Sequence, residues 1–378
     1  MSSRPLFELI LGTDRRDPDV ANAGQQPQGT YRRRRAPDDT KHHDSLSRAW
    51  GAHLTPHISA NLGPYVSDIP SQLLFVEDQR DAATQVGSDP RYGKDNVRVY
   101  KVHRDEAAGT QSVTEMTVCC MLEGQIEESY TKADNSVVVA TDSIKNTIYI
   151  KAKEHPVNPP ELYASILGQH FLDTYPHISA ANVSVVVHRW TRMVVDGKPH
   201  PHSFLRDGEE TRNAEVRVTR EGIEVTSGIA KLLVLKSTGS QFHGFVRDEF
   251  TTLPETWDRI LSTDVDATWK WTTFPTLAAL KEKVGAFDKA WEDARNICLK
   301  TFAEEDSPSV QATMYKMSEK ILEAAPGVAS VSLALPNKHY FEIDLSWHKG
   351  LKNTGKDAEV YAPQSGPNGL IKCTVSRS

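Results

Sequence analysis

From Arg91 onward, the hydrophobic pattern of this chain passes twice through one order: strands, two amphipathic helices, and strands again. Such an order is typical of an α+β fold, in which helices gather on one face of an antiparallel sheet. The two passages share little residue identity, so the duplication is one of architecture. We therefore predict two tandem units, 91–221 and 222–378.

The first unit shows the hydrophobic period of strands and that of helices. Its strands alternate apolar and polar residues, as expected where one face of a sheet is buried, and its helices repeat apolar residues every three or four positions. Pro159-Pro160 marks the start of the second helix. The expected strands are 96–100, 116–122, 183–190 and 215–219, and the helical stripes are Ile144, Ile148 and Ala152, then Leu162, Tyr163, Ile166, Leu167 and Phe171.

The second unit repeats the order with longer helices. One apolar stripe from Leu277 to Cys298 predicts a single long helix, and the serines of 307–309 are expected to cap the next helix. The expected strands are 223–225, 232–235, 265–271, 331–335 and 340–345, and the helical stripes are Leu277, Leu280, Val284, Phe287, Trp291, Ala294 and Cys298, then Val310, Met314, Met317 and Ile321.

Residues 1–90 have a different composition. They contain the Gln- and Gly-rich stretch 24–29 and a run of arginines, Arg32–Arg35, without a sustained hydrophobic period. Such a composition buries too little apolar surface to offset the loss of chain entropy. We expect a disordered or atypical N-terminal extension whose arginines are solvated, with an anionic partner as the alternative.

Charge and composition exclude several classes of protein. The formal net charge is −6, which gives no general attraction to nucleic acid. No apolar run approaches the ~20 residues of a membrane helix. The four cysteines form no CxxC pair, and adjacent Cys119-Cys120 should point to opposite faces of a strand. His200-Pro201-His202 has no third ligand nearby, so we expect reduced thiols and no metal site.

The expected sheets leave an open problem of burial. An antiparallel sheet with helices on one face exposes its other face and its edge strands. Assembly of several copies into a closed barrel would cover both. It would also place functional sites at subunit boundaries.

Four blocks stand out by their length and unusual composition: YGKD at 92–95, VATDSIKN at 139–146, LLVLKSTGSQFHGF at 232–245 and LPNKHYF at 335–341. Together with Phe250, Leu253 and Arg259, they resemble the urate oxidase (uricase) family from about residue 91 to the last residue. The resemblance implies the tunnelling fold (T-fold), in which two tandem units per chain assemble into a homotetrameric barrel. It also implies oxidation of urate by oxygen and water to 5-hydroxyisourate and hydrogen peroxide, a step of purine catabolism, without metal or organic cofactor.

The same resemblance assigns residues to a site shared between subunits. In the family, Lys94 and Thr141 act together with five residues of a neighbouring subunit: Phe242, Arg259, Gln311, Asn337 and His339. The residues that match the catalytic proton relay are Lys94, Thr141 and His339. The residues that match substrate-binding positions are Thr141, Asp142, Phe242, Arg259, Val310, Gln311 and Asn337.

These residue types suit a flat anionic purine. An aromatic ring such as Phe242 can stack on it, and the planar guanidinium of Arg259 can bind it at two points. The amide of Gln311 matches the group that binds the opposite edge, and Asn337 matches the residue that holds oxygen or water above the ring. The Thr141 hydroxyl is a weak base, so it needs a proton acceptor beside it.

Taken singly, these residues have ordinary structural interpretations. A Phe in a strand-rich block usually belongs to the core, an Arg usually forms an ion pair, and Thr141-Asp142 would be a helix cap. The alternatives are another T-fold enzyme that acts on a pterin or purine, and a catalytically silent relic that binds purines. The relic interpretation is disfavoured because the chain has all six of the residues expected in an active site: Lys94, Thr141, Arg259, Gln311, Asn337 and His339.

The chain departs from the family pattern at two places. His243 stands beside Phe242 where the family often has Trp. Residues 376–378 are Ser-Arg-Ser, where many members carry the peroxisomal signal Ser-Lys-Leu. A peroxisomal location is therefore expected by analogy alone, and the cytoplasm is the alternative.

Overall fold

The computed structural model describes residues 90–377. The expected extension at 1–90 and its arginine run, Arg32–Arg35, lie outside the described residues, apart from Pro90. Within the described part, no helix has the length and the apolar composition that a membrane span requires.

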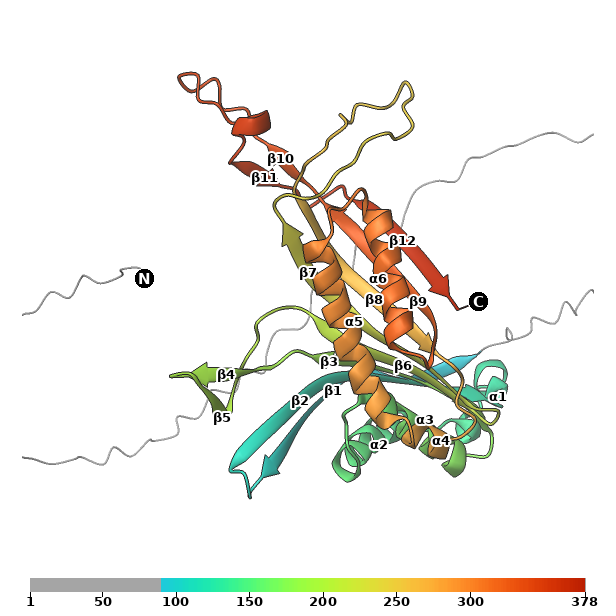
Figure 1. Cartoon of the computed structure of the whole chain (residues 1–378). Coiled ribbons are helices and arrows are strands. Elements are labelled where there is room, and N and C mark those ends of the chain that lie inside the picture. Colours follow the sequence, from blue (N-terminus) through green and yellow to red (C-terminus); the bar gives the residue numbers. More distant parts are fainter. Residues whose placement is uncertain (1–89, 378) are drawn as a thin grey trace, which may run out of the picture. The chain divides into compact units, whose positions relative to one another are not determined.

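One antiparallel sheet of eight strands organises the described residues (Figure 1). Its order is β1-β2-β3-β6-β7-β8-β9-β12, so β1 and β12 form the two edges. Two further ribbons pair β4 with β5 and β10 with β11. The bounds are β1 Arg91–Asp105, β2 Thr110–Gly124, β3 Ile178–His188, β4 Thr191–Val195, β5 Lys198–Leu205, β6 Thr211–Thr219, β7 Ile223–Lys236, β8 Leu261–Trp271, β9 Val328–Lys338, β10 Tyr340–Glu342, β11 Tyr361–Pro363 and β12 Gly369–Ser376.

The helices follow the expected order. Helix α3 packs on β3 and β6, α6 packs on β9 and β12, and α5 lies beside α6 over the second half of the sheet (Figure 1). The predicted α+β class, with helices against an antiparallel sheet, is confirmed. The bounds are α1 Glu127–Thr131, α2 Thr141–Glu154, α3 Pro160–Thr174, α4 Leu277–Lys281, α5 Val284–Glu304 and α6 Val310–Ala324, with 3₁₀ turns at η1 Asn135–Val137 and η2 Gly355–Asp357.

The core lies between the sheet and the helices. Strand β8 shows the alternation behind it: Trp269 is buried, whereas its neighbours Thr268 and Lys270 are exposed. Trp271 meets Phe287 of α5 edge to face, with ring centres 4.8 Å apart. Such aromatic pairs add to the free energy gained from buried area. The opposite face of the sheet carries polar residues such as Thr268 and Lys270, together with the exposed apolar Leu233 and Leu235 of β7.

Strand β7 differs from the sequence prediction. The expected strands 223–225 and 232–235 are one strand with an irregularity between Ile229 and Leu232, where Lys231 has φ 59°. The intervening Thr-Ser-Gly of 226–228 has the composition of a turn. Ladder hydrogen bonds to β6 and β8 on both sides nevertheless hold it extended. Tertiary pairing overrides the local turn propensity here.

Two further elements were predicted too long. The expected helix over 277–298 is divided into α4 and α5, because the N–H of Lys283 bonds the Leu280 carbonyl and the N–H of Ala286 bonds the Lys283 carbonyl. These three-residue steps are tighter than the α-helical repeat, yet Leu280 and Phe287 both remain buried. The expected strand 340–345 ends at Glu342.

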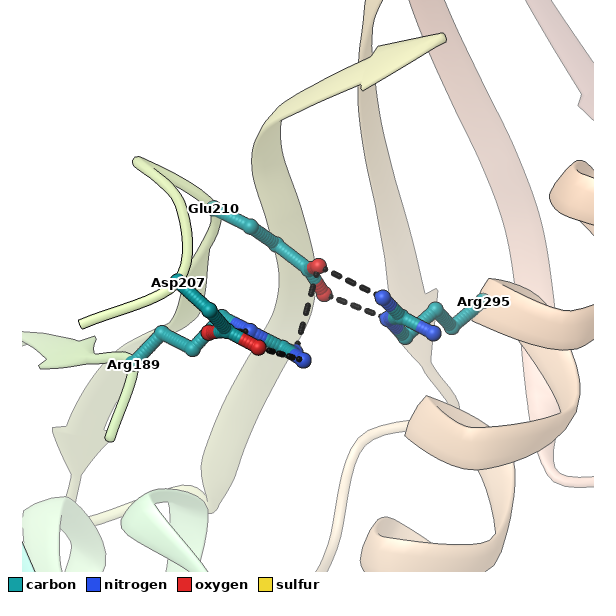
Figure 2. A network of polar contacts seen from close by, with 4 residues as sticks. All are labelled: Arg189, Asp207, Glu210 and Arg295. Carbon is teal, nitrogen blue, oxygen red and sulfur yellow. Dashed lines mark hydrogen bonds and ion pairs between the residues drawn. The ribbon is translucent and has the colours of Figure 1, made fainter. Parts of the chain in front are cut away.

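An ion-pair network holds the base of the β4–β5 ribbon against α5 (Figure 2). Arg189 Nε donates to Asp207 Oδ1 at 2.6 Å, and Arg295 on α5 donates twice to Glu210, at 2.7 and 2.9 Å. Arg189 also reaches Glu210, at 3.4 Å. The hydrogen bond from Arg189 lowers the pKa of Asp207 to about 2. The stabilising contribution of Asp207 is therefore lost only as the pH falls toward that value.

A buried carboxylate joins the two halves of the sheet. Glu161 of α3 is fully buried, and it accepts hydrogen bonds from Arg212 of β6 at 3.0 Å and from Ser227 of β7 at 2.7 Å. Trp271 of β8 donates its indole N–H to the same serine hydroxyl at 2.9 Å. The chain of contacts thus crosses from α3 through three neighbouring strands.

Replacement of Glu161 tests how much this carboxylate contributes to the stability of the fold. We expect Glu161→Ala to lower the free energy of unfolding by about 3 kcal/mol, because it removes the buried one of the two carboxylates that pair with the mostly buried guanidinium of Arg212; the other is that of Asp288. Urea denaturation at one fixed protein concentration measures the change. Glu282→Ala, at an exposed position, is the control and should change stability by less than about 0.5 kcal/mol. Equal stability of the two variants would contradict the prediction.

Candidate active site

Lys94 lies on the edge strand β1 just before an irregularity in its pairing with β2. Asn96 has φ 56° there, and the carboxylate of Asp95 accepts a hydrogen bond from its N–H at 2.7 Å. A Cβ on Gly93 would lie 1.9 Å from the carbonyl oxygen of Cys120, so only glycine allows this approach of the two strands. The backbone on both sides of Lys94 is therefore closely specified.

Thr141 and Asp142 open helix α2 next to this strand. The Tyr92 hydroxyl of β1 accepts a hydrogen bond from the N–H of Val139 at 2.6 Å, which ties β1 to the segment that leads into the helix. The hydrogen bond and charge of Lys145 lower the pKa of Asp142, and the charge of Lys94 contributes to the same shift. Lys94, Thr141 and Asp142 thus form one group, which we call the lysine–threonine cluster.

In the described part of the chain, no side chain caps the N-terminus of α2. Ala140 occupies the capping position, and Thr141 and Asp142 are exposed. The first N–H groups of a helix have no acceptor within the helix, and their partial positive charge attracts anions. The lysine–threonine cluster therefore combines a cation, a hydroxyl and uncapped N–H groups.

Phe242 and Arg259 come together in the loop between β7 and β8. The N–H of Arg259 donates to the Ser240 carbonyl at 2.9 Å, and Phe242 and Thr256 exchange two backbone hydrogen bonds of 2.8 and 3.0 Å. The guanidinium carbon of Arg259 lies 5.1 Å from the centre of the Phe242 ring. That ring is also stacked on Phe245, with centres 4.9 Å apart.

Arg259 retains capacity to bind an anion. Its Nε is buried and has no hydrogen-bond partner among residues 90–377, and burial lowers the pKa of its guanidinium. A buried, unsatisfied donor on a partly buried cation costs free energy that a bound carboxylate-like or enolate-like oxygen would recover. This is the clearest sign of a ligand in the loop.

Val310 and Gln311 begin helix α6 beside the same loop. Ser309 caps the helix and accepts a hydrogen bond from the N–H of Ala312 at 3.2 Å, as expected from the sequence. Val310 is buried, whereas the Gln311 side chain is exposed. We call Phe242, Arg259, Val310 and Gln311 the arginine–glutamine cluster.

Asn337 and His339 lie near the end of β9. Asn337 is opposite Thr263 of β8, two residues into the strand that follows Arg259, and it is 9% exposed. The His339 ring is stacked on Phe341, with centres 6.0 Å apart. A single extended strand from Asn337 to Leu345 would turn the side chains of Asn337 and His339 to one face. Strand β9 instead ends at Lys338, so that argument does not apply.

Within one chain the two clusters remain apart. Lys94 is on β1 and Asn337 is on β9, and six strand spacings of about 4.8 Å, about 29 Å along the sheet, separate these strands. Figure 1 likewise shows α2 at one end of the sheet and the segment between β7 and β8 at the other. The structure therefore gathers the expected residues into two half-sites.

Several residues that shape these half-sites were missed from the sequence. Tyr92 and Ser307 hold the two clusters through hydrogen bonds to residues far away in the chain, which no local pattern indicates. His243 is stacked on Trp257 with ring centres 5.3 Å apart. This pair adds aromatic packing next to Phe242 in the chain.

Metal ligands and reactive thiols do not gather in the described part of the chain. No group of three His, Cys, Asp or Glu side chains could hold an ion among residues 90–377. His200 and His202 pack ring against ring, with centres 4.7 Å apart. Burial raises the pKa of the Cys119 thiol to about 11 and that of Cys120 further, so neither is a thiolate at neutral pH.

Comparison with known proteins agrees with this arrangement. The family model described as Uricase matches residues 90–217 and 225–372. A uricase of Emericella nidulans is 69% identical over 288 residues, covering 76% of this chain and 96% of the relative. A uricase of Arabidopsis thaliana is 38% identical over 296 residues, covering 76% and 95%.

Solved structures lead to the same family. The crystal structure of uricase from Arthrobacter globiformis is 35% identical and superposes with a TM-score of 0.69, covering 78% of this chain and 96% of that one. The fold, the matched residues and the relatives agree over nearly all of the described part. This chain belongs to the uricase family.

Proposed function

We propose that this chain oxidises urate with molecular oxygen and water, giving 5-hydroxyisourate and hydrogen peroxide. Uricase relatives at up to 69% identity support the reaction. The observation that carries it in this chain is the buried, unpartnered Nε of Arg259 beside the Phe242 ring. A planar cation next to an aromatic face suits a flat purine anion.

Binding would use the arginine–glutamine cluster. Phe242 stacks on the purine, the guanidinium of Arg259 binds its oxygen and nitrogen atoms on one edge, and the Gln311 amide binds the opposite edge. The N–H of Val310 lies in the first turn of α6, at the partial positive end of the helix dipole, and would donate to the anion. These contacts leave the two faces of the ring for stacking and for oxygen.

Catalysis would use the residues that can move a proton or hold oxygen. Lys94, Thr141 and His339 relay the proton that leaves urate, and Thr141 and Asp142 complete the edge of the site. The resulting dianion gives two electrons to oxygen, which becomes hydrogen peroxide after taking up two protons. Water supplies the hydroxyl group at the oxidised carbon, and Asn337 holds oxygen or this water above the ring. The electrons come from urate, so the proposal includes no metal or organic cofactor.

The assembly would complete the site. The lysine–threonine cluster of one subunit would meet the arginine–glutamine cluster, Asn337 and His339 of its neighbour. The edge strands β1 and β12 have free ladder groups that a second copy can pair. We propose a homotetrameric barrel in which each chain supplies two T-fold units, 91–221 and 222–378, divided at the turn between β6 and β7. We propose a peroxisomal location by analogy with the family alone, with the cytoplasm as the alternative.

The reaction is tested by urate-dependent oxygen uptake in buffer with a chelator, with peroxide measured alongside. We expect full activity there, and inactivation by the chelator would contradict the cofactor-free mechanism. Lys94→Ala should lower kcat by about 10²-fold to 10³-fold, because proton transfer loses its acceptor. Lys153→Ala, at an exposed lysine of α2, is the control and should keep the wild-type kcat.

The shared site is tested by mixing two inactive variants. Thr141→Ala damages one half-site and Arg259→Ala damages the other, so each pure protein should lose most of its activity at a urate concentration near the wild-type KM. Oligomers formed from an equal mixture, denatured and refolded together, should recover about a quarter of wild-type activity. Half of the random pairs are mixed, and one of their two sites is intact. No recovery from a mixture that forms mixed oligomers would show that the site lies within one chain.

A further inference from the structure

One short segment, residues 239–241, is hydrogen-bonded to both parts of the arginine–glutamine cluster: to Arg259 and to the chain just before α6. The Ser240 carbonyl accepts a hydrogen bond from the N–H of Arg259 at 2.9 Å. On its other side, the same segment exchanges two backbone hydrogen bonds with Ser307: Ser307 N–H to the Gly239 carbonyl at 2.9 Å and Gln241 N–H to the Ser307 carbonyl at 2.7 Å. Ser307 is fully buried just before α6, so the segment 239–241 sets the spacing between Arg259 and the start of that helix.

The pairing between the two loop arms contains one extra residue. Phe242 pairs with Thr256, and two residues earlier Ser240 bonds Arg259, which lies three residues after Thr256. Such a β-bulge redirects the side chain that follows it. The direction of the Arg259 side chain therefore depends on the bulge that precedes it.

Asp258 braces this bulge with both carboxylate oxygens. Oδ2 accepts a hydrogen bond from the Thr238 hydroxyl at 2.7 Å, and Oδ1 accepts one from the N–H of Gly239 at 2.9 Å. The Asp258 carbonyl accepts a third, from the Thr256 hydroxyl, at 2.7 Å. Gly239 has φ 75°, a conformation that favours glycine, so the turn that receives these bonds is itself specific.

The charge of Asp258 acts in the opposite direction to its hydrogen bonds. A carboxylate adjacent to Arg259 repels an anionic ligand, even where water screens the interaction. If charge were its only effect, removal of Asp258 would strengthen the binding of urate. If its hydrogen bonds aim Arg259, removal would weaken binding. The direction of the change separates the two effects.

We propose that Asp258 is a positioning residue that fixes Arg259 and the start of α6 at the separation a purine anion requires. The inference rests on the proposed function, because the ligand is the same urate. Asp258 touches neither the substrate nor oxygen in this account. It acts through the backbone of 238–241.

The test is a titration of the tetrameric protein with urate under nitrogen, where binding occurs without turnover. We expect Asp258→Ala to raise the dissociation constant about tenfold, which corresponds to about 1.4 kcal/mol. KM with oxygen present should rise similarly while kcat stays within about threefold, because Arg259 holds substrate and transition state alike. Asp258→Asn should stay within about threefold of wild type, since its amide can accept from Gly239 and donate to Thr238.

A matched control lies in the same loop. The carboxylate of Asp248 also accepts from a backbone N–H and a threonine hydroxyl, those of Phe250 and Thr251, but only within its own turn. Asp248→Ala should bind urate as wild type does. Unchanged or tighter binding by Asp258→Ala, or equal losses in Asp258→Ala and Asp258→Asn, would overturn the proposal.

Two further measurements distinguish failure of this inference from failure of the proposed function. If Asp258→Ala fails to fold, Thr238→Val removes one of the same hydrogen bonds, and it should weaken binding about threefold. Wild-type affinity in Thr238→Val would then overturn the inference. If the wild-type protein neither binds nor oxidises urate, the proposed function fails, whatever the variants do.

Discussion

The whole architecture depends on the backbone pairing between β6 and β7. Val216 lies opposite Val225, and the ladder continues on both sides, so two similar units share one continuous sheet. The buried contact of Glu161 with Arg212 and Ser227 reinforces this junction across the helix-covered face. Because the units merge edge to edge, the free edges move to the outer strands. The half-sites lie far from each other for the same reason.

Most of the fold could be predicted from hydrophobic spacing. The expected stripe of Ile144, Ile148 and Ala152 is the buried face of α2, and that of Met314, Met317 and Ile321 is the buried face of α6. One error occurred where long-range hydrogen bonds decide the outcome, and another where local three-residue hydrogen bonds interrupt a helix. The turn-like composition of 226–228 is held extended by strands on both sides, and the break before α5 leaves the apolar stripe intact. Spacing reports which face is buried and says little about where a backbone bends.

The site residues were named from family resemblance, and the structure gives several of them a physical context. The Ser309 cap of α6 was visible in the sequence. The interpretation of Thr141-Asp142 as a cap of α2 was wrong, because Ala140 occupies the capping position and both residues lie inside the helix. The unsatisfied Nε of Arg259 was not visible in the sequence, because its burial depends on a loop closed by contacts across the chain. Asp258 was missed for a similar reason. Its hydrogen-bond partners precede it by about twenty residues. The local sequence Trp-Asp-Arg does not distinguish a positioning carboxylate from an ordinary surface carboxylate.

The ion-pair network at the base of the β4–β5 ribbon has a consequence for association. A two-stranded ribbon is marginally stable by itself in water. Here Arg189, Asp207, Glu210 and Arg295 clamp its root to α5, so the ribbon has a set direction before anything touches it (Figure 2). A neighbouring molecule that meets the ribbon encounters a preorganised arm, and little conformational entropy remains to be lost on contact. The fixed base of the β4–β5 ribbon thus favours rapid and well-aligned association with any molecule that contacts its far end.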